Sequence, residues 1–475
     1  MEYRANTTLG EAMAAPEVLT DTIAAISTPP GRGGIGIVRL SGPQAAPIAA
    51  QLVHPHQPLE HAHARLADVL DPADADDPRI DEALVTFFCA PNSYTAEDLI
   101  EIAAHGSPVV LELLLRRALE LGARLAEPGE FTQRAFLAGR VDLTQAEAVR
   151  DLIDAQTLTQ ARQAASQMGG ALSRRAAPAK QSLVELIALL EAGIDFAEDD
   201  IDVTPQAEIA RRIELIMPPL AALEGSFARG RIVHDGLTMA IVGRPNVGKS
   251  SLFNRLVERD RAIVTASPGT TRDLVSERIS IEGIPIELVD TAGFRECAGQ
   301  LLEEAERLGI RRSHEALADA ALVLIVLDAT QPLNDEDHRL LAAVDGRPAI
   351  VALNKSDLVA NEKGTASISE PGSPTISTSA LTGEGIVALR ERILALATGG
   401  AAAEPGMLTN LRQHQAVTTA LSALADAAKA NEGSIPHEMI LLDLYRALWA
   451  LDSLTGQTTS DDILKLIFST FCIGK

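Results

Sequence analysis

The sequence predicts an α/β multidomain protein in which a doubly wound sheet is inserted into a helical domain. From residue 237 to residue 399, short apolar runs alternate with helical stretches, which is typical of such a sheet. Apolar residues recur at helical spacing in residues 141–236 and again in residues 400–475. The 475 residues suffice for three domains at ~150 residues each. The spacing leaves open whether the two helical segments contact each other.

Residues 21–140 are expected to fold as an α+β domain, preceded by a leader over residues 1–20. Ser107 suits a helix cap, Pro108 the first helical position and Gly122 the position after the last turn, so a helix is predicted between them. Four short apolar runs predict strands. These runs are Ile23–Ser27, Ile35–Leu40, Leu84–Cys89 and Leu99–Ala104.

Two local signals indicate how the helical domain is built. Thr144 and Glu147 have the spacing of a capping box, which predicts a helix whose N-cap is Thr144. Near the end of the chain, Trp449 lies in an apolar stripe at helical spacing and is expected to pack in a core.

In the doubly wound domain, the predicted strands are Leu237–Val242, Ile279–Ile281, Ile286–Val289, Leu322–Leu327, Ile350–Leu353 and Thr375–Ser377.

The composition is that of an acidic globular protein, with 46% hydrophobic residues and a formal net charge of −24. This charge disfavours a surface that coats nucleic acid, although a local basic patch is compatible with it. No apolar run approaches the ~18 residues of a membrane span, and no basic n-region of a signal peptide precedes the first apolar segment. Cys89, Cys297 and Cys472 are too widely spaced for a disulfide scaffold. We therefore expect a cytoplasmic protein with no membrane association and no disulfide partner.

Residues Gly243–Ser250 match the P-loop pattern G-x-x-x-x-G-K-S. They follow an apolar strand and precede a helical run, which is the context that a P-loop requires. Backbone amides in such a loop surround phosphates, and the N-terminal end of the next helix attracts them. Lys249 is expected to reach the outer phosphates, and the hydroxyl of Ser250 is expected to bind Mg²⁺.

Three further motifs follow the P-loop at the ends of predicted strands or between them. Asp290-Thr-Ala-Gly293 can hold Mg²⁺ through water and sense the third phosphate, and a hydroxyl of Thr270-Thr271 can complete the Mg²⁺ shell. Asp357, in Asn354-Lys-Ser-Asp357, can accept two hydrogen bonds from the N–H edge of guanine, and Ser379-Ala380 can donate to the guanine oxygen. The four motifs in this order predict a Ras-like GTP-binding domain.

The residue after Gly293 bears on the rate of hydrolysis. Many GTPases have a glutamine there that orients the attacking water, and an arginine finger neutralises charge. Here the residue is Phe294, which can do neither, so the domain either hydrolyses GTP slowly or uses other groups. The side-chain carbonyl of Asn246 can hold a monovalent cation near the bridging oxygen. The alternative is that Asn246 only shapes the loop.

Six motifs outside the nucleotide site, together with Asn246 inside the P-loop, point to one family. They are Pro29-Pro-Gly-Arg-Gly-Gly34, Pro91-Asn-Ser-Tyr-Thr-Ala-Glu-Asp98, Pro128-Gly-Glu-Phe131, Asp142-Leu-Thr-Gln-Ala-Glu147, Leu454-Thr-Gly456 and Phe471-Cys-Ile-Gly-Lys475. On these residues the chain resembles the bacterial and organellar tRNA modification GTPase family MnmE, also called TrmE. The resemblance extends from about Thr22 to Lys475.

The resemblance implies three domains and a joint reaction. Residues 21–140 would form a folate-binding-like domain that makes a homodimer and holds a tetrahydrofolate derivative, either 5-formyl- or methylene-. Residues 141–236 and 400–475 would form the helical domain, which ends in Phe-Cys-Ile-Gly-Lys, and residues 237–399 the inserted GTPase domain. With a flavoprotein partner, MnmG (also called GidA), the family adds a carboxymethylaminomethyl-type group to carbon 5 of the wobble uridine of certain tRNAs. K⁺-dependent pairing of the G domains activates hydrolysis.

The resemblance also implies roles for individual residues. Glu306 would be the catalytic glutamate, with Glu303 and Glu304 as alternatives nearby, and Asn246 and Lys249 would act with it. The tetrahydrofolate contacts would be Arg39, Glu97, Arg140 (where the family more often has lysine) and Lys475, the Mg²⁺ ligands Ser250 and Thr271, and the K⁺ ligands Asn246, Thr265, Ser267 and Thr270. The GTP contacts would be Asn246, Val247, Gly248, Lys249, Ser250, Ser251, Thr265, Ala266, Ser267, Pro268, Gly269, Thr270, Thr271, Asp290, Thr291, Ala292, Gly293, Asn354, Lys355, Asp357, Ser379 and Ala380.

A different class of function stays open. A ribosome-assembly GTPase, or another regulatory switch, binds GTP but performs no chemistry on a base. Proteins of the first kind usually append a basic RNA-binding module. The segment after Gly399 is instead helical and acidic to neutral, without a GXXG clamp on a basic helix. The sequence therefore favours the tRNA-modifying GTPase.

Overall fold

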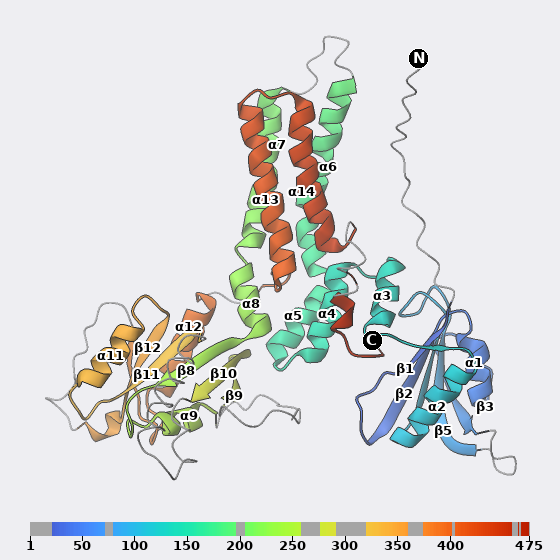
Figure 1. Cartoon of the computed structure of the whole chain (residues 1–475), viewed down its shortest axis with the longest axis horizontal. Helices are drawn as coiled ribbons and strands as arrows, with labels where there is room; N and C mark the ends of the chain where they lie inside the picture. Colours follow the sequence, from blue (N-terminus) through green and yellow to red (C-terminus); the bar gives the residue numbers. More distant parts are fainter. Residues whose placement is uncertain are drawn as a thin grey trace, which may run out of the picture. The chain divides into compact units, whose positions relative to one another are not determined.

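Two units make up the computed structural model of the chain (Figure 1). The first comprises Met1–Arg150 and Thr455–Lys475, and the second comprises Asp151–Leu454. The structure describes residues 21–71, 79–195, 205–257, 276–290, 320–359, 374–400, 404–457, 464 and 467–474. The expected leader, residues 1–20, lies outside the described residues. The expected domain boundaries at 140/141, 236/237 and 399/400 stay predictions.

A seven-stranded sheet forms the centre of the first unit. In spatial order its strands are β3 (Val53–Pro55), β4 (Ala64–Leu70), β5 (Arg79–Phe88), β6 (Leu99–Gly106), β2 (Gly33–Ser41), β1 (Ile23–Ile26) and β7 (Arg124–Leu125). All neighbours are antiparallel except β1 and β7. Core residues occupy every second position, for example Val38 and Leu40 or Ile100 and Ile102, because alternate side chains of a strand share one face. Helices α1 (Ala45–Leu52) and α2 (Pro108–Glu120) pack into that core.

The C-terminal segment completes the first unit. Leu464, Phe468 and Phe471 share a small core with Leu143 and Ala146 of α4 (Leu143–Asp154). The approach is close at Gly129, just before α3 (Glu130–Leu137). A Cβ at Gly129 would lie 2.6 Å from the carbonyl oxygen of Phe468, and φ there is +71°, so a side chain is excluded on both grounds.

The capping expected at two helices of this unit differs in the structure. Thr144 lies inside α4, and its hydroxyl donates to Asp142 Oδ1 at 2.7 Å. The reciprocal pair is formed instead by Asp142 and Gln145: Asp142 Oδ1 accepts from the Gln145 amide, and Gln145 Oε1 accepts from the Asp142 amide, each at 3.0 Å. The predicted box was therefore wrong by two residues, because aspartate caps as well as threonine does. At α2, Ser107 makes no side-chain capping bond, although the helix begins at Pro108 as predicted.

Four long helices form one core in the second unit, and two of them come from each helical segment of the chain. They are α6 (Ala171–Asp195), α7 (Gln206–Glu224), α13 (Leu411–Glu432) and α14 (His437–Thr455), which lie side by side in Figure 1. Leu186, Ile213, Leu424 and Leu444 are among their fully or almost fully buried residues. This contact answers the question that the sequence left open. Trp449, however, is 59% exposed, so the expectation that it packs in the core was wrong.

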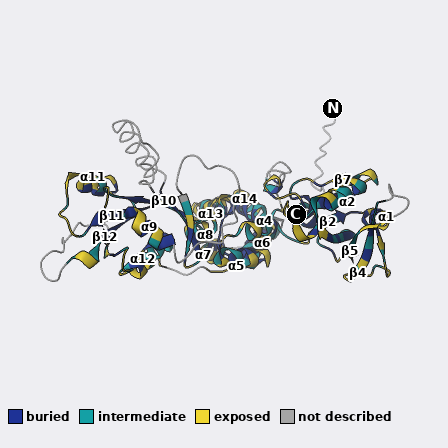
Figure 2. Cartoon of the chain, turned by 90° about the horizontal axis from the view of Figure 1, so that it is seen from below, coloured by how far each residue is buried: buried dark blue, intermediate teal, exposed yellow. Residues whose placement is uncertain are grey.

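A six-stranded sheet carries the predicted nucleotide motifs. In spatial order its strands are β13 (Thr375–Ser377), β12 (Ala349–Asn354), β11 (Leu322–Asp328), β8 (Leu237–Val242), β10 (Ile284–Asp290) and β9 (Ser276–Ile281). All pairs are parallel except β9 with β10, so this sheet is doubly wound with an antiparallel edge. Its two faces carry separate cores, one with α9 (Lys249–Val257) and α12 (Ile386–Thr398), the other with α11 (Asp335–Ala343). Because both faces are covered, β11 and β12 are buried along their whole length (Figure 2).

The described part of the chain also bears on membrane insertion. None of its helices combines the length and the apolar character that crossing a bilayer demands.

A histidine links two helical segments of the second unit. His234, near the end of α8 (Phe227–Asp235), lies between two carboxylates: Nε2 is 3.1 Å from Asp151 Oδ1, and Nδ1 is 2.7 Å from Asp235 Oδ1. The hydrogen bond with Asp151 is the main reason why the pKa of His234 rises from 6.5 to about 9, since burial opposes the shift only in part.

This arrangement predicts a pH-dependent stability. A raised pKa stabilises the fold fully below pH 6.5, and the contribution is lost as the pH rises from 6.5 through 9. We expect the second unit to lose stability on the order of 3 kcal/mol over that range, measured by calorimetric unfolding at a series of pH values. His234→Gln should flatten the profile. An identical slope in His234→Gln would contradict the assignment.

Candidate functional site

The P-loop connects β8 to α9 and is already folded around its own lysine. Its backbone has positive φ at Gly243 (+154°), Asn246 (+65°) and Gly248 (+96°), a region that glycine and asparagine enter at the lowest cost. Lys249 Nζ donates to the carbonyl oxygens of Gly243 at 2.8 Å and Arg244 at 2.7 Å. The lysine is only 7% exposed, so its ammonium group is held at the centre of the loop. An ammonium group in this position can exchange carbonyl oxygens for phosphate oxygens.

Asn354, the last residue of β12, joins the P-loop to a second loop. Its Nδ2 donates to the carbonyl oxygen of Val247 at 2.9 Å, and its Oδ1 accepts from the amide of Ala380 at 3.0 Å. Asn354 is 2% exposed, and both ends of its amide are used. The Ser379 amide likewise donates to the carbonyl oxygen of Glu384 at 3.0 Å. The amides of Ser379 and Ala380, which we expected to face guanine, are thus hydrogen-bonded within the protein in this structure.

Lys355 and Asp357 follow Asn354 and differ in their surroundings. Lys355 has φ of +66°, and its Nζ donates to the Asn246 carbonyl oxygen at 2.8 Å and to Asp328 Oδ2 at 2.7 Å. Burial raises the pKa of Asp328, but hydrogen bonds from Lys355 and Thr330 outweigh it, so this pKa lies below its ordinary value. Asp357 is exposed in a short 3₁₀ turn, Ser356–Leu358, where its carboxylate is accessible to a base.

A buried ion pair holds the P-loop from the other side. Arg244 Nε lies 2.8 Å from Asp337 Oδ1, and the Asp337 side chain is fully buried in the first turn of α11. Asp337 also forms a capping box with Asn334, in which each side chain accepts from the other's amide. The sequence did not single out Arg244. Removing either charge would leave its partner buried and unpaired, which makes the P-loop dependent on this contact.

A second polar site lies on the sheet of the first unit, around Arg39 of β2. Arg39 donates from Nε at 3.0 Å and from Nη2 at 2.6 Å to Glu101 Oε1, and from Nη1 at 3.2 Å to the Gly474 carbonyl oxygen. Its guanidinium also lies over the rings of Tyr94 and Phe131, 5.7 and 5.5 Å from the ring centres. The contacts with Glu101, Gly474 and the two aromatic rings therefore fix the orientation of the Arg39 side chain.

The charges of two arginines, Arg39 and Arg140, act on the pKa of Tyr94. Burial raises the pKa of Tyr94, while a hydrogen bond with Thr132 and the charges of Arg39 and Arg140 lower it in part. Arg140 is exposed, and its charge acts on Tyr94 together with that of Arg39. Gly474, whose carbonyl oxygen accepts from Arg39, has φ of +92° and no room for a Cβ, which would approach the Ile26 carbonyl oxygen to 2.7 Å.

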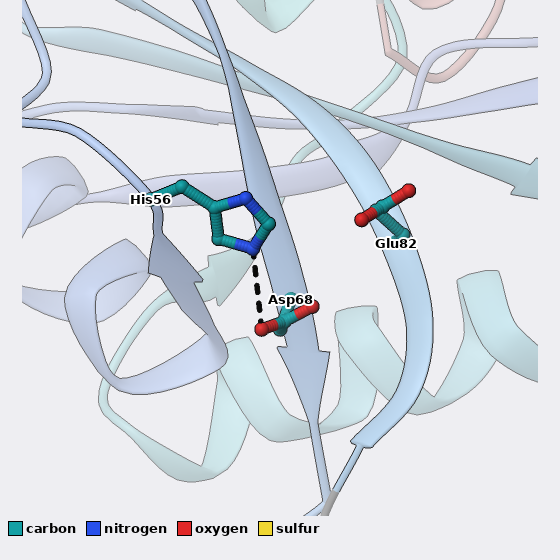
Figure 3. A group of neighbouring side chains, drawn as sticks. All are labelled: His56, Asp68 and Glu82. Carbon is teal, nitrogen blue, oxygen red and sulfur yellow. Dashed lines mark ion pairs between the residues drawn. The ribbon is translucent and has the colours of Figure 1, made fainter.

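His56, Asp68 and Glu82 form a cluster on three neighbouring segments of the first unit (Figure 3). Their ligand atoms lie within 4.8 Å of one another, and Asp68 and Glu82 are directly opposite on β4 and β5. Like charges so placed repel each other unless a cation lies between them. Arg79 provides that charge, with Nε 3.0 Å from Asp68 Oδ1 and Nη2 3.2 Å from Glu82 Oε1. Arg79 therefore offsets part of the negative charge of this cluster, and we assign no metal to it.

Comparison with known proteins identifies the family. The family model "GTP-binding protein TrmE N-terminus" matches residues 22–140, and the model "MnmE helical domain" matches residues 143–472. The tRNA modification GTPase MnmE of Koribacter versatilis is 57% identical over 466 residues, which cover 96% of this chain and 100% of that protein. The MnmE of Moorella thermoacetica is 42% identical over 472 residues, with the same coverage. The chain belongs to the tRNA modification GTPase MnmE family.

Membership in the MnmE family makes the chain a GTPase with an N-terminal TrmE domain, a helical domain and a G domain. Part of the chain is also similar to solved structures of other GTPases. The G domain of the T. maritima FeoB iron transporter is 29% identical, with a TM-score of 0.26 over 34% of this chain and 98% of that chain. Aquifex aeolicus Era bound to GDP·AlF₄⁻ is 26% identical, with a TM-score of 0.28 over 39% of this chain and 66% of that chain.

The structure brings together part of the residues that were expected to bind nucleotide. Residues 246–251 form the P-loop and the start of α9, and Asn354, Lys355, Ser379 and Ala380 are connected to that loop directly or through one contact. Asp290 ends β10, beside Ile241 of β8. The following expected residues lie outside the described residues: Thr265, Ala266, Ser267, Pro268, Gly269, Thr270, Thr271, Thr291, Ala292, Gly293, Glu303, Glu304, Glu306 and Lys475.

Sequence reasoning missed the residues that hold the expected site residues in place. Arg244 and Asp337 are 93 positions apart, and no local pattern connects them. Ser41 and Arg134, both fully or nearly buried, contact Glu97 and were also missed. One signal was available: Glu130 and Arg134 have the i,i+4 spacing of an ion pair on one helix face.

Gly248 offers a test of how the P-loop is packed. A Cβ at this position would lie 2.3 Å from Asn354 Nδ2, so Gly248→Ala must displace the amide that joins the two loops. We expect GTP affinity, measured by calorimetric titration with Mg²⁺ present, to fall by about 10- to 100-fold. Gly346→Ala is the matched control, since Gly346 also has positive φ (+75°) but meets nothing within 4 Å. Equal affinity losses in the two variants would show that backbone strain, and not the contact with Asn354, matters.

Proposed function

We propose that this GTPase acts with a flavoprotein partner, MnmG, to add a carboxymethylaminomethyl-type group to carbon 5 of the wobble uridine of certain tRNAs. The observation that carries the proposal is the second polar site, around Arg39, in a unit that contains none of the described nucleotide-binding residues. A nucleotide switch alone has no use for such a site, whereas a reaction that consumes a one-carbon donor requires one. Because tRNA is the substrate, we place the protein in the cytoplasm.

A tetrahydrofolate derivative, 5-formyl- or methylene-, fits the charges around Arg39. Arg140 is a cation that can pair with a carboxylate of the glutamyl tail. Arg39 already pairs with Glu101 and keeps two N–H groups for such a carboxylate, and Lys475 follows Gly474, which contacts Arg39. Glu97 is 22% exposed at its side chain and can accept hydrogen bonds from ring N–H groups. When bound, the folate supplies the one-carbon unit. The residues of this chain bind and orient it.

In the G domain, the proposal assigns Mg²⁺ to Ser250 and Thr271 and K⁺ to Asn246, Thr265, Ser267 and Thr270. Asn246 supports the assignment because its side chain is exposed and its backbone is held at positive φ. Lys355 donates to the backbone carbonyl oxygen of Asn246, which leaves the side-chain carbonyl for the cation. A side chain so placed can hold a cation beside the phosphates without moving the loop. K⁺-dependent pairing of two G domains within a homodimer would complete the site, with Glu306 positioning the attacking water.

The competing proposal is a ribosome-assembly or regulatory GTPase without chemistry on a base. It uses the same nucleotide site, so the GTPase activity does not distinguish the two. The modification state of tRNA does, because only the first proposal requires a change in it.

We expect deletion of the gene to remove one modified wobble uridine from bulk tRNA. Nucleoside analysis by liquid chromatography and mass spectrometry should show its loss, and expression of the wild-type chain should restore it. Expression of Lys249→Ala should fail to restore it, because the P-loop lysine holds the outer phosphates. An unchanged nucleoside profile in the deletion strain would favour the ribosome-assembly or regulatory role.

The cation assignment predicts a salt effect on hydrolysis. We expect the rate with KCl to exceed the rate with NaCl by at least about tenfold, because a cation at Asn246 would neutralise the charge that an arginine finger neutralises in other GTPases. Asn246→Ala should remove the difference between the salts. Asn254→Ala makes the same substitution at an exposed position of α9 and should keep it. Equal rates of the wild-type protein in both salts would contradict the assignment.

A further inference from the structure

Arg134, on α3, is a buried arginine that binds three carboxylates. It is 2% exposed, and its Nη2 donates to Asp21 Oδ1 at 2.8 Å and to Glu130 Oε1 at 2.9 Å. Its Nη1 donates to the Asp21 carbonyl oxygen at 3.1 Å and to both oxygens of Glu97, at 3.1 and 3.2 Å. A buried guanidinium is stable only when its charge is matched in this way. The two Nη groups make all of these contacts, and Nε has no hydrogen-bond partner among the described residues.

Two of the three carboxylates fix Arg134 without the help of Glu97. Burial raises the pKa of Glu130, but hydrogen bonds from Arg124, the Glu127 amide and Arg134 outweigh it, so this pKa is lowered. The pKa of Asp21 is lowered in the same way, against burial, by Arg124 and Arg134. Both carboxylates are therefore ionised at neutral pH. Their contacts hold Arg134 in place independently of Glu97.

Glu97 has a second support from β2. The Ser41 hydroxyl donates to Glu97 Oε2 at 2.7 Å and can accept from the Thr95 hydroxyl, which lies 2.6 Å away. Ser41 and Thr95 are fully buried, so their hydroxyl groups cannot form hydrogen bonds with solvent instead. The carboxylate of Glu97 is thus fixed from two elements, α3 and β2.

The contacts distribute unevenly over the two oxygens of Glu97. Within the described residues, Oε2 accepts from both Ser41 and Arg134, whereas Oε1 accepts from Arg134 alone. Each carboxylate oxygen has about two lone-pair sites. Oε2 is then saturated, and Oε1 keeps the capacity for one further donor.

We propose that Arg134 is a positioning residue for ligand binding at Glu97. Together with Ser41 it orients the Glu97 carboxylate so that Oε1 presents its spare acceptor to an N–H group of the ligand. This inference rests on the proposed function, in which the ligand of this site is a tetrahydrofolate derivative. Arg134 itself does not contact the ligand.

A double-mutant cycle tests whether Arg134 acts through Glu97. Calorimetric titration of the full-length protein with 5-formyltetrahydrofolate would be made for the wild type, Arg134→Lys, Glu97→Ala and the double variant. Lysine keeps the charge but loses the two-pronged contact. We expect Arg134→Lys to weaken binding about tenfold in the wild-type background and to have no further effect in the Glu97→Ala background.

Two further variants keep the test decisive. Ser41→Ala removes the other support of Glu97 without touching Arg134, and we expect it to behave like Arg134→Lys in both backgrounds, even if the arginine variant does not fold. Arg124→Ala is the matched control, because Arg124 pairs with Asp21 and Glu130 but does not contact Glu97. It should lower thermal stability with little change in affinity.

The outcomes separate the inference from the proposal beneath it. If the wild-type protein does not bind 5-formyltetrahydrofolate, the proposed folate site is wrong, and the role of Arg134 falls with it. If the wild type binds but Arg134→Lys and Ser41→Ala bind equally well, only the positioning role is overturned. Equal losses of affinity with and without Glu97 would also overturn it, because Arg134 would then act on the fold in general.

Discussion

The nucleotide site depends on one buried amide. Asn354 lies between the P-loop and the loop at residues 379–380, and its side chain hydrogen-bonds to both. Since the two loops follow different strands, their spacing would otherwise be set only by the sheet. The amide also explains why residue 248 must be glycine, because any Cβ there meets Asn354 Nδ2. Lys249 and Lys355 donate to further carbonyl oxygens of the P-loop, those of Gly243, Arg244 and Asn246.

Both sites of the chain use buried ion pairs for rigidity. Asp337 pairs with Arg244 of the P-loop, and Arg134 pairs with Glu97 of the proposed folate site. Asp337 and Arg134 are both buried charges. Such pairs contribute little net stability, since the desolvation of two charges offsets their attraction. They do penalise every alternative arrangement, because breaking a pair leaves a charge buried alone. A site that must bind a flexible, charged ligand gains affinity when its own groups are already ordered.

The sequence predicted what depends on local pattern. β8, β11 and β12 were found because strands buried on both faces read as continuous apolar runs, and the P-loop because its backbone conformation requires glycines at fixed spacing. The strands β3 and β7 were missed, since short edge strands carry too few apolar residues. The interior strand β4 was missed because Arg65 and Asp68 interrupt its apolar residues. The contacts that position the sites were missed for a different reason: Arg134 meets Asp21 across 113 positions, and no period in the sequence encodes such a distance.

The path of the chain gives the two sites a physical connection. The polypeptide passes from the first unit to the second at Arg150 and returns at Thr455, so residues at both ends of the inserted segment belong to the Arg39 unit. The returning end is held firmly there, by the core around Phe468 and by the bond from Arg39 to the Gly474 carbonyl oxygen. A change in the second unit on GTP hydrolysis would therefore act on the first through two covalent links, one of which leads to a residue that contacts Arg39. In the proposed function, coupling between GTP hydrolysis and the folate site would use these two links as its route.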